Sequence, residues 1–286
     1  MEPILEVKNL CKKYPGFGLK DISFTMPRGY IMGFIGPNGA GKSTTIKLIL
    51  NLIKRDSGEI KLFGMDNIQK ELAIKDRIGF VFDENHYYEE LNIQEMKKIV
   101  APFYRNWDEH TFAKYLVDFN LPRKKKIKDL SKGMKMKFSL AIALSHQADL
   151  LIMDEPTSGL DPVVRNELLE ILTYLIQDEN KGIFLSTHIT SDLDKIADYI
   201  TLINEGEIIF STPKDELLDY HGMVKGGKDL LDKEVRNNFI GIKEHQYGFE
   251  GLVKDRQKAS KVFEKHKVLV EKPTLEDILL YYTRGY

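Results

Sequence analysis

The sequence predicts an α/β fold whose central sheet is mostly parallel. Short apolar runs of buried-strand length, such as residues 31–35 and 150–153, alternate with segments in which apolar residues recur at helical spacing. Strands and helices in this alternating order build a parallel sheet with helices against its faces. A glycine-rich segment, residues 36–44, lies between the first of these runs and a helical pattern. The predicted order there is strand, tight turn and helix.

Other strands surround this segment in the sequence. Period-two spacing, or a short apolar run bounded by turn residues, predicts them at residues 4–7, 22–26, 59–63, 78–82 and 183–185. Between about residues 84 and 147 the pattern becomes helical, and its last helix is expected over about 131–146. We expect these residues to form a helical subdomain.

The C-terminal part of the chain differs in character from the rest. Charged, glycine-containing sequence leads into strand-like residues 239–242 and 268–270, and an amphipathic helix is expected to start at Thr274. We therefore predict two domains, residues 1–212 and a small C-terminal α/β extension of residues 213–286.

Composition and charge exclude several classes of protein. Of the 286 residues, 42% are hydrophobic and 30% are charged, as in a globular protein. The net charge of −1 gives no global basic field for nucleic acid, and the lysine-rich residues 123–128 lack interleaved aromatic residues. The single Cys11 excludes an internal disulfide and a multi-cysteine zinc site. Without a spanning segment or a signal peptide, we expect a cytoplasmic protein with no direct membrane insertion.

Residues 36–44 have the spacing of a phosphate-binding P-loop. Glycines let backbone N–H groups turn toward a phosphate, and the N-terminus of the following helix adds its positive dipole end. Lys42 can reach the β- and γ-phosphates, and the Ser43 hydroxyl can bind Mg²⁺. An ordinary glycine turn would explain the glycines but not these two residues after them. The predicted nucleotide-binding residues of the loop are Gly36, Pro37, Asn38, Gly39, Ala40, Gly41, Lys42, Ser43 and Thr44.

Two carboxylates end the predicted buried strand of residues 150–153. Asp154 and Glu155 would project at the edge of a parallel sheet where ligands bind. Taken alone, they could equally be an exposed strand end. After a P-loop, Asp154 is expected to hold Mg²⁺ and Glu155 to polarise the attacking water as general base.

Three further motifs give the chain a family resemblance. Residues 130–133 (LSKG) resemble the signature motif of ATP-binding cassette (ABC) proteins, residues 158–161 (SGLD) resemble their D-loop, and residues 186–188 (STH) resemble their switch histidine. With the P-loop, these motifs follow the family's order over about residues 4–212. The chain is similar to the nucleotide-binding subunit of an ABC transporter. The resemblance implies a P-loop NTPase core with an antiparallel β subdomain and a helical subdomain.

The resemblance also implies roles for single residues of an ATP site. His188 would sense the γ-phosphate, and Tyr14 would stack on the adenine ring. Ser131 and Gly133 begin a helix, and in this family that helix end binds the γ-phosphate held by the other cassette. One P-loop and one signature per chain imply a head-to-tail dimer with a second copy or a paralogous cassette. Asp161 would couple the two halves.

Two departures from the family pattern concern this site. Where the family has a glutamine after the strand of residues 78–82, this chain has Asp83 and then Glu84. An ionised acid cannot donate a hydrogen bond, but Asp83 could serve Mg²⁺ through water. In the signature, Lys132 replaces the usual first glycine and Met134 the frequent glutamine, while the anion-binding residues are kept.

These features predict an ATPase that uses ATP and Mg²⁺ and drives a separate transmembrane permease. It would be cytoplasmic and peripheral on the inner face of the cell membrane. ATP would close the dimer and hydrolysis would open it. The acidic pair at residues 83–84, Met134 and the C-terminal extension resemble bacterial ABC-2-type export cassettes, which favours export.

The alternative is a soluble ABC-type ATPase that acts on ribosomes or DNA without a permease. Ribosome-acting members usually carry two cassettes in one chain, and DNA-repair members insert a long coiled coil. Neither feature is visible in this sequence. A GTPase is disfavoured because residues 180–183 (NKGI) lack the guanine-reading aspartate.

Overall fold

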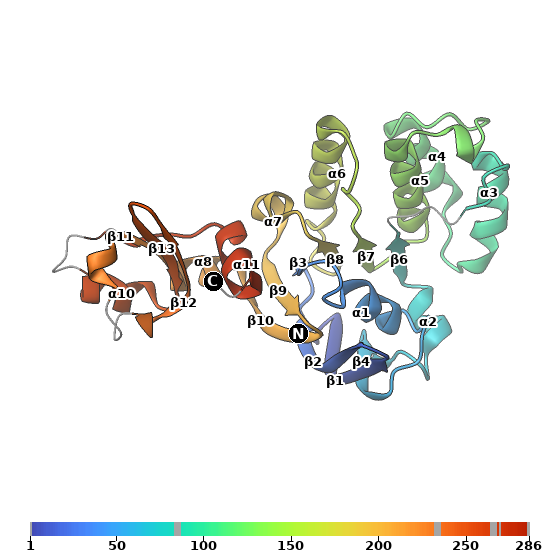
Figure 1. Ribbon diagram of the computed structural model, residues 1–286. Coiled ribbons are helices and arrows are strands. Elements are labelled where there is room, and N and C mark those ends of the chain that lie inside the picture. Colours follow the sequence, from blue (N-terminus) through green and yellow to red (C-terminus); the bar gives the residue numbers. More distant parts are fainter. Residues whose placement is uncertain (1, 83–86, 232–235, 264–267, 269, 285–286) are drawn as a thin grey trace.

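The computed structural model describes the chain except residues 1, 83–86, 232–235, 264–267, 269 and 285–286. Its centre is a six-stranded sheet in the order β10-β9-β3-β8-β7-β6 (Figure 1). Neighbouring strands are parallel except β9 and β10, which pair antiparallel. The mostly parallel sheet is therefore confirmed. Its strands are β3 (Ile31–Ile35), β6 (Ile78–Val81), β7 (Leu150–Asp154), β8 (Gly182–Thr187), β9 (Tyr199–Asn204) and β10 (Glu207–Pro213).

A four-stranded antiparallel sheet packs against the central one, in the order β2-β1-β4-β5. The strand expected at residues 4–7 is longer in the structure because the pairing continues past an irregularity next to Asn9, whose φ is 49°. A left-handed residue of this kind fits a bulge, where one extra residue is accommodated without ending the strand. The strands are β1 (Leu5–Tyr14), β2 (Phe17–Met26), β4 (Ser57–Leu62) and β5 (Met65–Asp66).

Helices connect the parallel strands, as their direction requires. The predicted helical region between β6 and β7 contains α3, α4 and α5, and α5 also packs on β6. The helices of this part of the chain are α1 (Lys42–Ile49), α2 (Glu71–Lys75), α3 (Ile93–Val100), α4 (Glu109–Asp118), α5 (Lys132–Ser145), α6 (Pro162–Leu175) and α7 (Thr190–Ile196), with short 3₁₀ turns η1 (Ala101–Phe103) and η2 (Ile127–Asp129).

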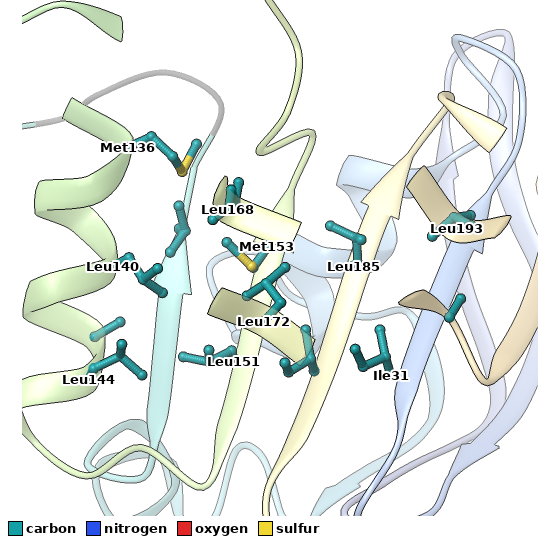
Figure 2. Packing of buried hydrophobic residues seen from close by; sticks show 14 of the residues in the cluster. Ile31, Met136, Leu140, Leu144, Leu151, Met153, Leu168, Leu172, Leu185 and Leu193 are labelled. Atoms are coloured by element: carbon teal, nitrogen blue, oxygen red, sulfur yellow. The ribbon is translucent and has the colours of Figure 1, made fainter. Parts of the chain in front are cut away.

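The central strands alternate their side chains between two apolar cores. Leu151, Met153 and Leu185 point to the face covered by α5, α6 and α7 (Figure 2). Ile152 and Phe184, one position along, point to the opposite core, which contains α1 and the antiparallel sheet. A strand buried on both faces must be apolar at successive positions, which explains why these strands appear as continuous apolar runs in the sequence.

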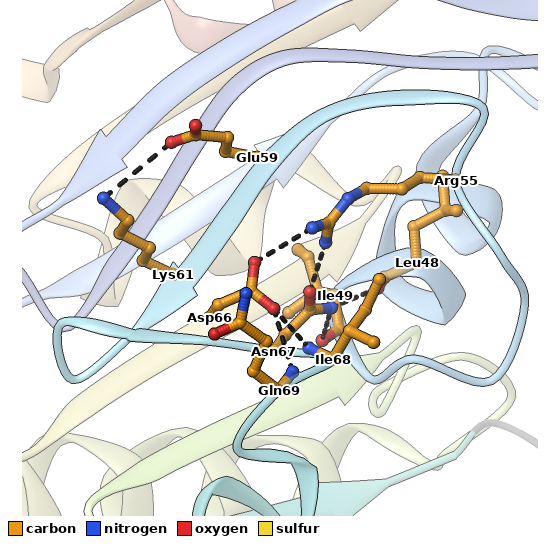
Figure 3. A network of polar contacts seen from close by, with 9 residues as sticks. All are labelled: Leu48, Ile49, Arg55, Glu59, Lys61, Asp66, Asn67, Ile68 and Gln69. Atoms are coloured by element: carbon orange, nitrogen blue, oxygen red, sulfur yellow. Dashed lines mark hydrogen bonds and ion pairs between the residues drawn. The ribbon is translucent and has the colours of Figure 1, made fainter.

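The P-loop helix α1 is held at its C-terminal end by the antiparallel sheet (Figure 3). The Asn67 side chain, 2% exposed, donates hydrogen bonds to the carbonyls of Leu48 at 2.8 Å and Ile49 at 3.0 Å. The Arg55 guanidinium donates to the Asn67 side-chain oxygen at 2.5 Å and to Asp66 Oδ2 at 2.9 Å. The Asn67 bonds reach carbonyls in the last turn of α1, where intrahelical partners run out, and they anchor the C-terminal end of that helix.

The C-terminal part builds a third sheet, in the order β12-β13-β11-β14, with a small apolar core of its own. Of the residues expected to form a strand at 268–270, Val270 lies in β14, and residue 269 is outside the described residues. Thr274 and Asp277 exchange the hydrogen bonds of a capping box at the start of the last helix, α11, which then packs against α7. The elements are α8 (Lys214–Tyr220), β11 (Gly222–Gly226), η3 (Lys228–Leu230), β12 (Phe239–His245), β13 (Gly248–Val253), α10 (Arg256–Phe263), β14 (Val270–Glu271) and α11 (Leu275–Arg284).

Phe184 joins the two large sheets, and its removal should destabilise the protein. Its fully buried ring lies 5.2 Å from that of Phe34 on β3 and 5.9 Å from that of Phe24 on β2, between ring centroids. Phe184→Ala should lower the free energy of unfolding in urea by about 3–5 kcal/mol, because a cavity remains where the ring packed. The control Tyr174→Ala, at a residue 78% exposed on α6, should change it by less than about 0.5 kcal/mol. Equal losses would contradict this role.

His146, at the end of α5, should make stability depend on pH. Its buried ring stacks on Tyr104 with centroids 3.8 Å apart, and burial lowers the pKa of His146 to about 4. An unfolded histidine has a pKa near 6.5, so the unfolded chain binds an extra proton between about pH 6.5 and pH 4, and stability falls as the pH falls through this window. His146→Phe should reduce the drop in thermal midpoint between pH 7 and pH 5. The control His110→Phe, at an exposed position, should retain the full drop in thermal midpoint. An unchanged drop in His146→Phe would show that His146 does not cause the pH dependence.

Candidate functional site

The P-loop connects β3 to α1 through positions that only glycine fits. Gly41 precedes α1 with a φ of 114°, and a Cβ there would lie 2.5 Å from a methyl carbon of Leu19. A Cβ on Gly36 would lie 2.2 Å from the carbonyl oxygen of Ile203. The loop therefore passes close to β9 and turns its backbone into the helix start, as a phosphate-binding loop requires.

The side chains of the loop differ in their exposure. Asn38, Gly39 and Ser43 are exposed, Pro37 and Thr44 are half-buried, and Gly36, Ala40 and Gly41 are buried. Lys42 is only 6% exposed, and its Nζ donates to the carbonyls of Gly36 at 2.8 Å and Pro37 at 3.3 Å. The ammonium group thus lies over the loop that is predicted to hold phosphates.

The carboxylate of Glu155 connects two other predicted site residues. Glu155 Oε1 lies 3.5 Å from Lys42 Nζ, and Glu155 Oε2 lies 2.8 Å from His188 Nδ1. Oε2 also accepts a hydrogen bond from the backbone N–H of His188 at 3.3 Å. The Glu155 backbone has a φ of 49°, and its N–H donates to the Ser186 carbonyl at 2.9 Å. The structure therefore brings Lys42, Glu155 and His188 together from the ends of β3, β7 and β8.

Three buried oxygen atoms near the end of β7 lack hydrogen-bond partners among the described residues. They are Asp154 Oδ1, Thr157 Oγ1 and Ser186 Oγ. Asp154 pairs with Ser186 in the parallel register of β7 and β8. Buried polar atoms of a native protein are nearly always satisfied, and oxygen donors with a carboxylate suit Mg²⁺. These residues fit the expected metal. Thr157 was not among the predicted site residues. Its position three residues after Asp154 in the sequence could have indicated it.

The signature residues lie at the start of α5. The Ser131 hydroxyl accepts a hydrogen bond from the N–H of Met134 at 3.2 Å and caps the helix. Gly133 is buried, and a Cβ there would lie 2.8 Å from a methyl carbon of Val164 on α6. The close packing of α5 against α6 is thus a second reason why a residue without a side chain is needed at position 133. Within the described part of the chain, no hydrogen bond joins Ser131 or Gly133 to the P-loop.

Two other predicted site residues, Asp161 and Tyr14, lie at the start of α6 and at the end of β1. Asp161 caps α6, since its Oδ1 accepts hydrogen bonds from the N–H groups of Val163 and Val164, both at 3.1 Å. Tyr14 ends β1 and is 43% exposed, which leaves its ring accessible for stacking. Asp83 lies outside the described residues.

No helix in the described ranges is both long enough and apolar enough to cross a bilayer.

The chain resembles known proteins in sequence and in fold. A family profile described as "ABC transporter" matches residues 19–158. The bacitracin transport ATP-binding protein BcrA of Bacillus licheniformis is 34% identical over 76% of this chain and 72% of its own length. The lantibiotic transport ATP-binding protein SrtF of Streptococcus pyogenes is 35% identical over 74% of this chain and 92% of its own.

A solved structure supports the same relationship. It is described as an ATP-binding subunit of an ABC transporter, and it matches with a TM-score of 0.69 and 31% identity over 75% of this chain and 91% of its own. The motifs, the fold and relatives of more than 30% identity agree. The chain belongs to the ABC transporter family, as an ATP-binding subunit that hydrolyses ATP to drive transport.

Proposed function

We propose that two copies of this chain, or this chain and a paralogous cassette, bind ATP at two composite sites and drive a separate transmembrane permease. The observation that carries the catalytic part is the position of the Glu155 carboxylate between Lys42 Nζ, at 3.5 Å, and His188 Nδ1, at 2.8 Å. A carboxylate there can accept a proton from an attacking water, while the two neighbours interact with the γ-phosphate.

Backbone N–H groups of the P-loop and Lys42 would bind the phosphates of ATP, and Tyr14 would stack on the adenine. Lys42 must exchange its hydrogen bonds to loop carbonyls for phosphate oxygens, which costs little because both partners are oxygen acceptors nearby. His188, with a side chain 48% exposed, can turn toward the γ-phosphate while Glu155 holds its Nδ1. The tautomer of His188 would then follow from that hydrogen bond.

Mg²⁺ would be held by Ser43 and Asp154, with Asp83 as a ligand through water. The support is the buried Asp154 Oδ1, which no described residue satisfies. When bound, Mg²⁺ neutralises charge on the β- and γ-phosphate oxygens.

The composite site rests on the position of the signature residues. Ser131 is exposed at a helix N-terminus, and Asp161 caps the next helix, α6, with one carboxylate oxygen. Because Ser131 and Gly133 make no hydrogen bond with the P-loop of their own chain among the described residues, a partner cassette would bring a second signature helix to the bound ATP. Closure of the dimer would follow ATP binding, and hydrolysis would release it.

The transported compound and the direction of transport are proposals from similarity. Relatives named for the transport of bacitracin and of a lantibiotic favour an antimicrobial compound as the transported molecule. We propose export through a permease, with this chain on the cytoplasmic face of the membrane. Residues 213–286 would be an accessory domain, since their sheet has its own apolar core.

Glu155→Gln should retain ATP binding and lose hydrolysis. Glutamine keeps the shape of the side chain but cannot accept the proton, so phosphate release should fall by about 10²–10⁴-fold. The variant should also elute as a dimer in size-exclusion chromatography at saturating Mg-ATP. The matched control Glu170→Gln, at an exposed position on α6, should hydrolyse ATP like the unmodified protein. Hydrolysis by Glu155→Gln at the unmodified rate would show that the assigned role is wrong.

Affinity-tagged protein, isolated in detergent from the membranes of its own cells, should carry a polytopic membrane protein with it. This follows because the cassette must contact a permease to drive transport. Mass spectrometry of the eluate identifies the partner. Recovery with ribosomal subunits and without a membrane protein would contradict the permease assignment.

A further inference from the structure

The helix that follows His188 is too short to hold itself in place. α7 has seven residues, Thr190–Ile196, and the residue before it, Ile189, supplies no side-chain cap. Isolated helices shorter than about 12 residues are marginal in water, so contacts with neighbouring elements determine where α7 lies. Only Ile189 separates α7 from His188. The same contacts therefore determine the backbone position of His188.

An ion pair between a buried carboxylate and a partly exposed guanidinium joins the start of α7 to the start of α6. Asp192 is 0% exposed, and its Oδ1 lies 2.6 Å from Arg165 Nε. Arg165 also donates from Nη2 to the hydroxyl of Ser191 at 2.8 Å. One guanidinium thus binds two successive residues in the first turn of α7, which constrains the rotation of the helix as well as its distance from α6.

Stability alone is a weak reason for this pair. Removing a carboxylate from water costs free energy that the attraction to its partner only partly returns, and apolar residues of similar volume often serve stability as well. Asp192 Oδ2 is also buried, and it has no hydrogen-bond partner in the part of the chain that is described. The free-energy cost of removing the Asp192 carboxylate from water is therefore offset only by the bond that Oδ1 makes. Unlike an apolar contact, an ion pair with charge-assisted hydrogen bonds fixes the direction in which the two side chains meet.

The pair also connects His188 to the D-loop motif. The N–H of Arg165 donates to the carbonyl of Asp161 at 3.0 Å, in the first turn of α6. Arg165 thus lies one turn from the residue proposed to couple the two cassettes, and its side chain reaches the helix that carries the switch histidine.

We propose that Arg165 and Asp192 are positioning residues for ATP hydrolysis. Their ion pair holds α7 so that His188 Nδ1 stays against the Glu155 carboxylate, and it transmits displacements of the D-loop to His188. The inference rests on the proposed role of His188. Among the described residues, no hydrogen bond or ion pair joins either of them to Glu155, so both would act through the histidine.

The test is a double-mutant cycle between Asp192 and His188 in the full-length chain. Asp192→Asn keeps the size of the side chain but removes the charge that binds the guanidinium. It should lower kcat for Mg-ATP by about tenfold, because a displaced catalytic group loses rate, while KM changes by less than about twofold. In a His188→Ala background, the same substitution should change kcat by less than about twofold, since residues acting as one unit are not additive.

A second Arg–Asp pair, away from the predicted ATP site, provides a control. Arg77 Nε lies 2.6 Å from Asp149 Oδ2, just before β6 and β7 begin. Asp149→Asn removes an Arg–Asp pair with the same Nε–Oδ distance, in which the aspartate is more exposed, and should leave kcat unchanged. Thermal unfolding of each variant shows whether it is folded. If Asp192→Asn does not fold, Arg165→Lys replaces it in the cycle, since an ammonium cannot reproduce the two bonds of the fork.

The outcomes separate the inference from the function on which it depends. The positioning role would be overturned if Asp192→Asn left kcat unchanged. It would also be overturned if Asp192→Asn lowered kcat equally in the unmodified and the His188→Ala background. A normal kcat for His188→Ala alone would instead overturn the proposed role of His188. If Asp149→Asn lowered kcat as much as Asp192→Asn, the loss would reflect general destabilisation of the protein. That result would overturn the inference.

Discussion

The parallel pairing of β3, β7 and β8 is the constraint on which the site depends. In register, Ile35 lies beside Thr187, and Asp154 lies beside Ser186, so the three strands end at one edge of the sheet. Each strand then leads into a different segment: the P-loop, the acidic pair, or His188. Parallel strands need long crossovers, and the helices between them supply these. Residues far apart in the sequence are thus brought within hydrogen-bond distance.

Lys42 and Glu155 form an ion pair at this edge, and both side chains are largely shielded from water. Lys42 is 6% exposed and the Glu155 side chain 16%, so their attraction is screened less than that of a surface pair. Glu155 has a left-handed backbone, which is uncommon for a residue with a side chain and is one of the strained conformations found at functional sites. Its N–H bond to the Ser186 carbonyl helps to hold that conformation.

Local patterns in the sequence predicted the central strands β3, β6, β7 and β8, the P-loop and the carboxylates of β7, because each depends on residues that are adjacent in the chain. Strands β9 and β10, at one edge of the same sheet, were not predicted. Contacts between distant residues left no such signal. The Arg165–Asp192 pair joins two helices, the fit of Gly133 depends on Val164, and Asn67 supports α1 from another sheet. Strands β11 and β13 were also missed: each has glycines at or near its ends and a short apolar stretch, so neither shows a clear alternation.

The contact between α11 and α7 has a consequence for the synthesis of the protein. Leu193 of α7 and Leu275 and Ile278 of α11 are buried in one core, yet a whole sheet separates the two helices along the chain. The ribosome therefore completes α7 long before α11 emerges. Until then, the part of α7 that contacts α11 stays uncovered, and exposed apolar surface of this kind makes incomplete chains prone to associate.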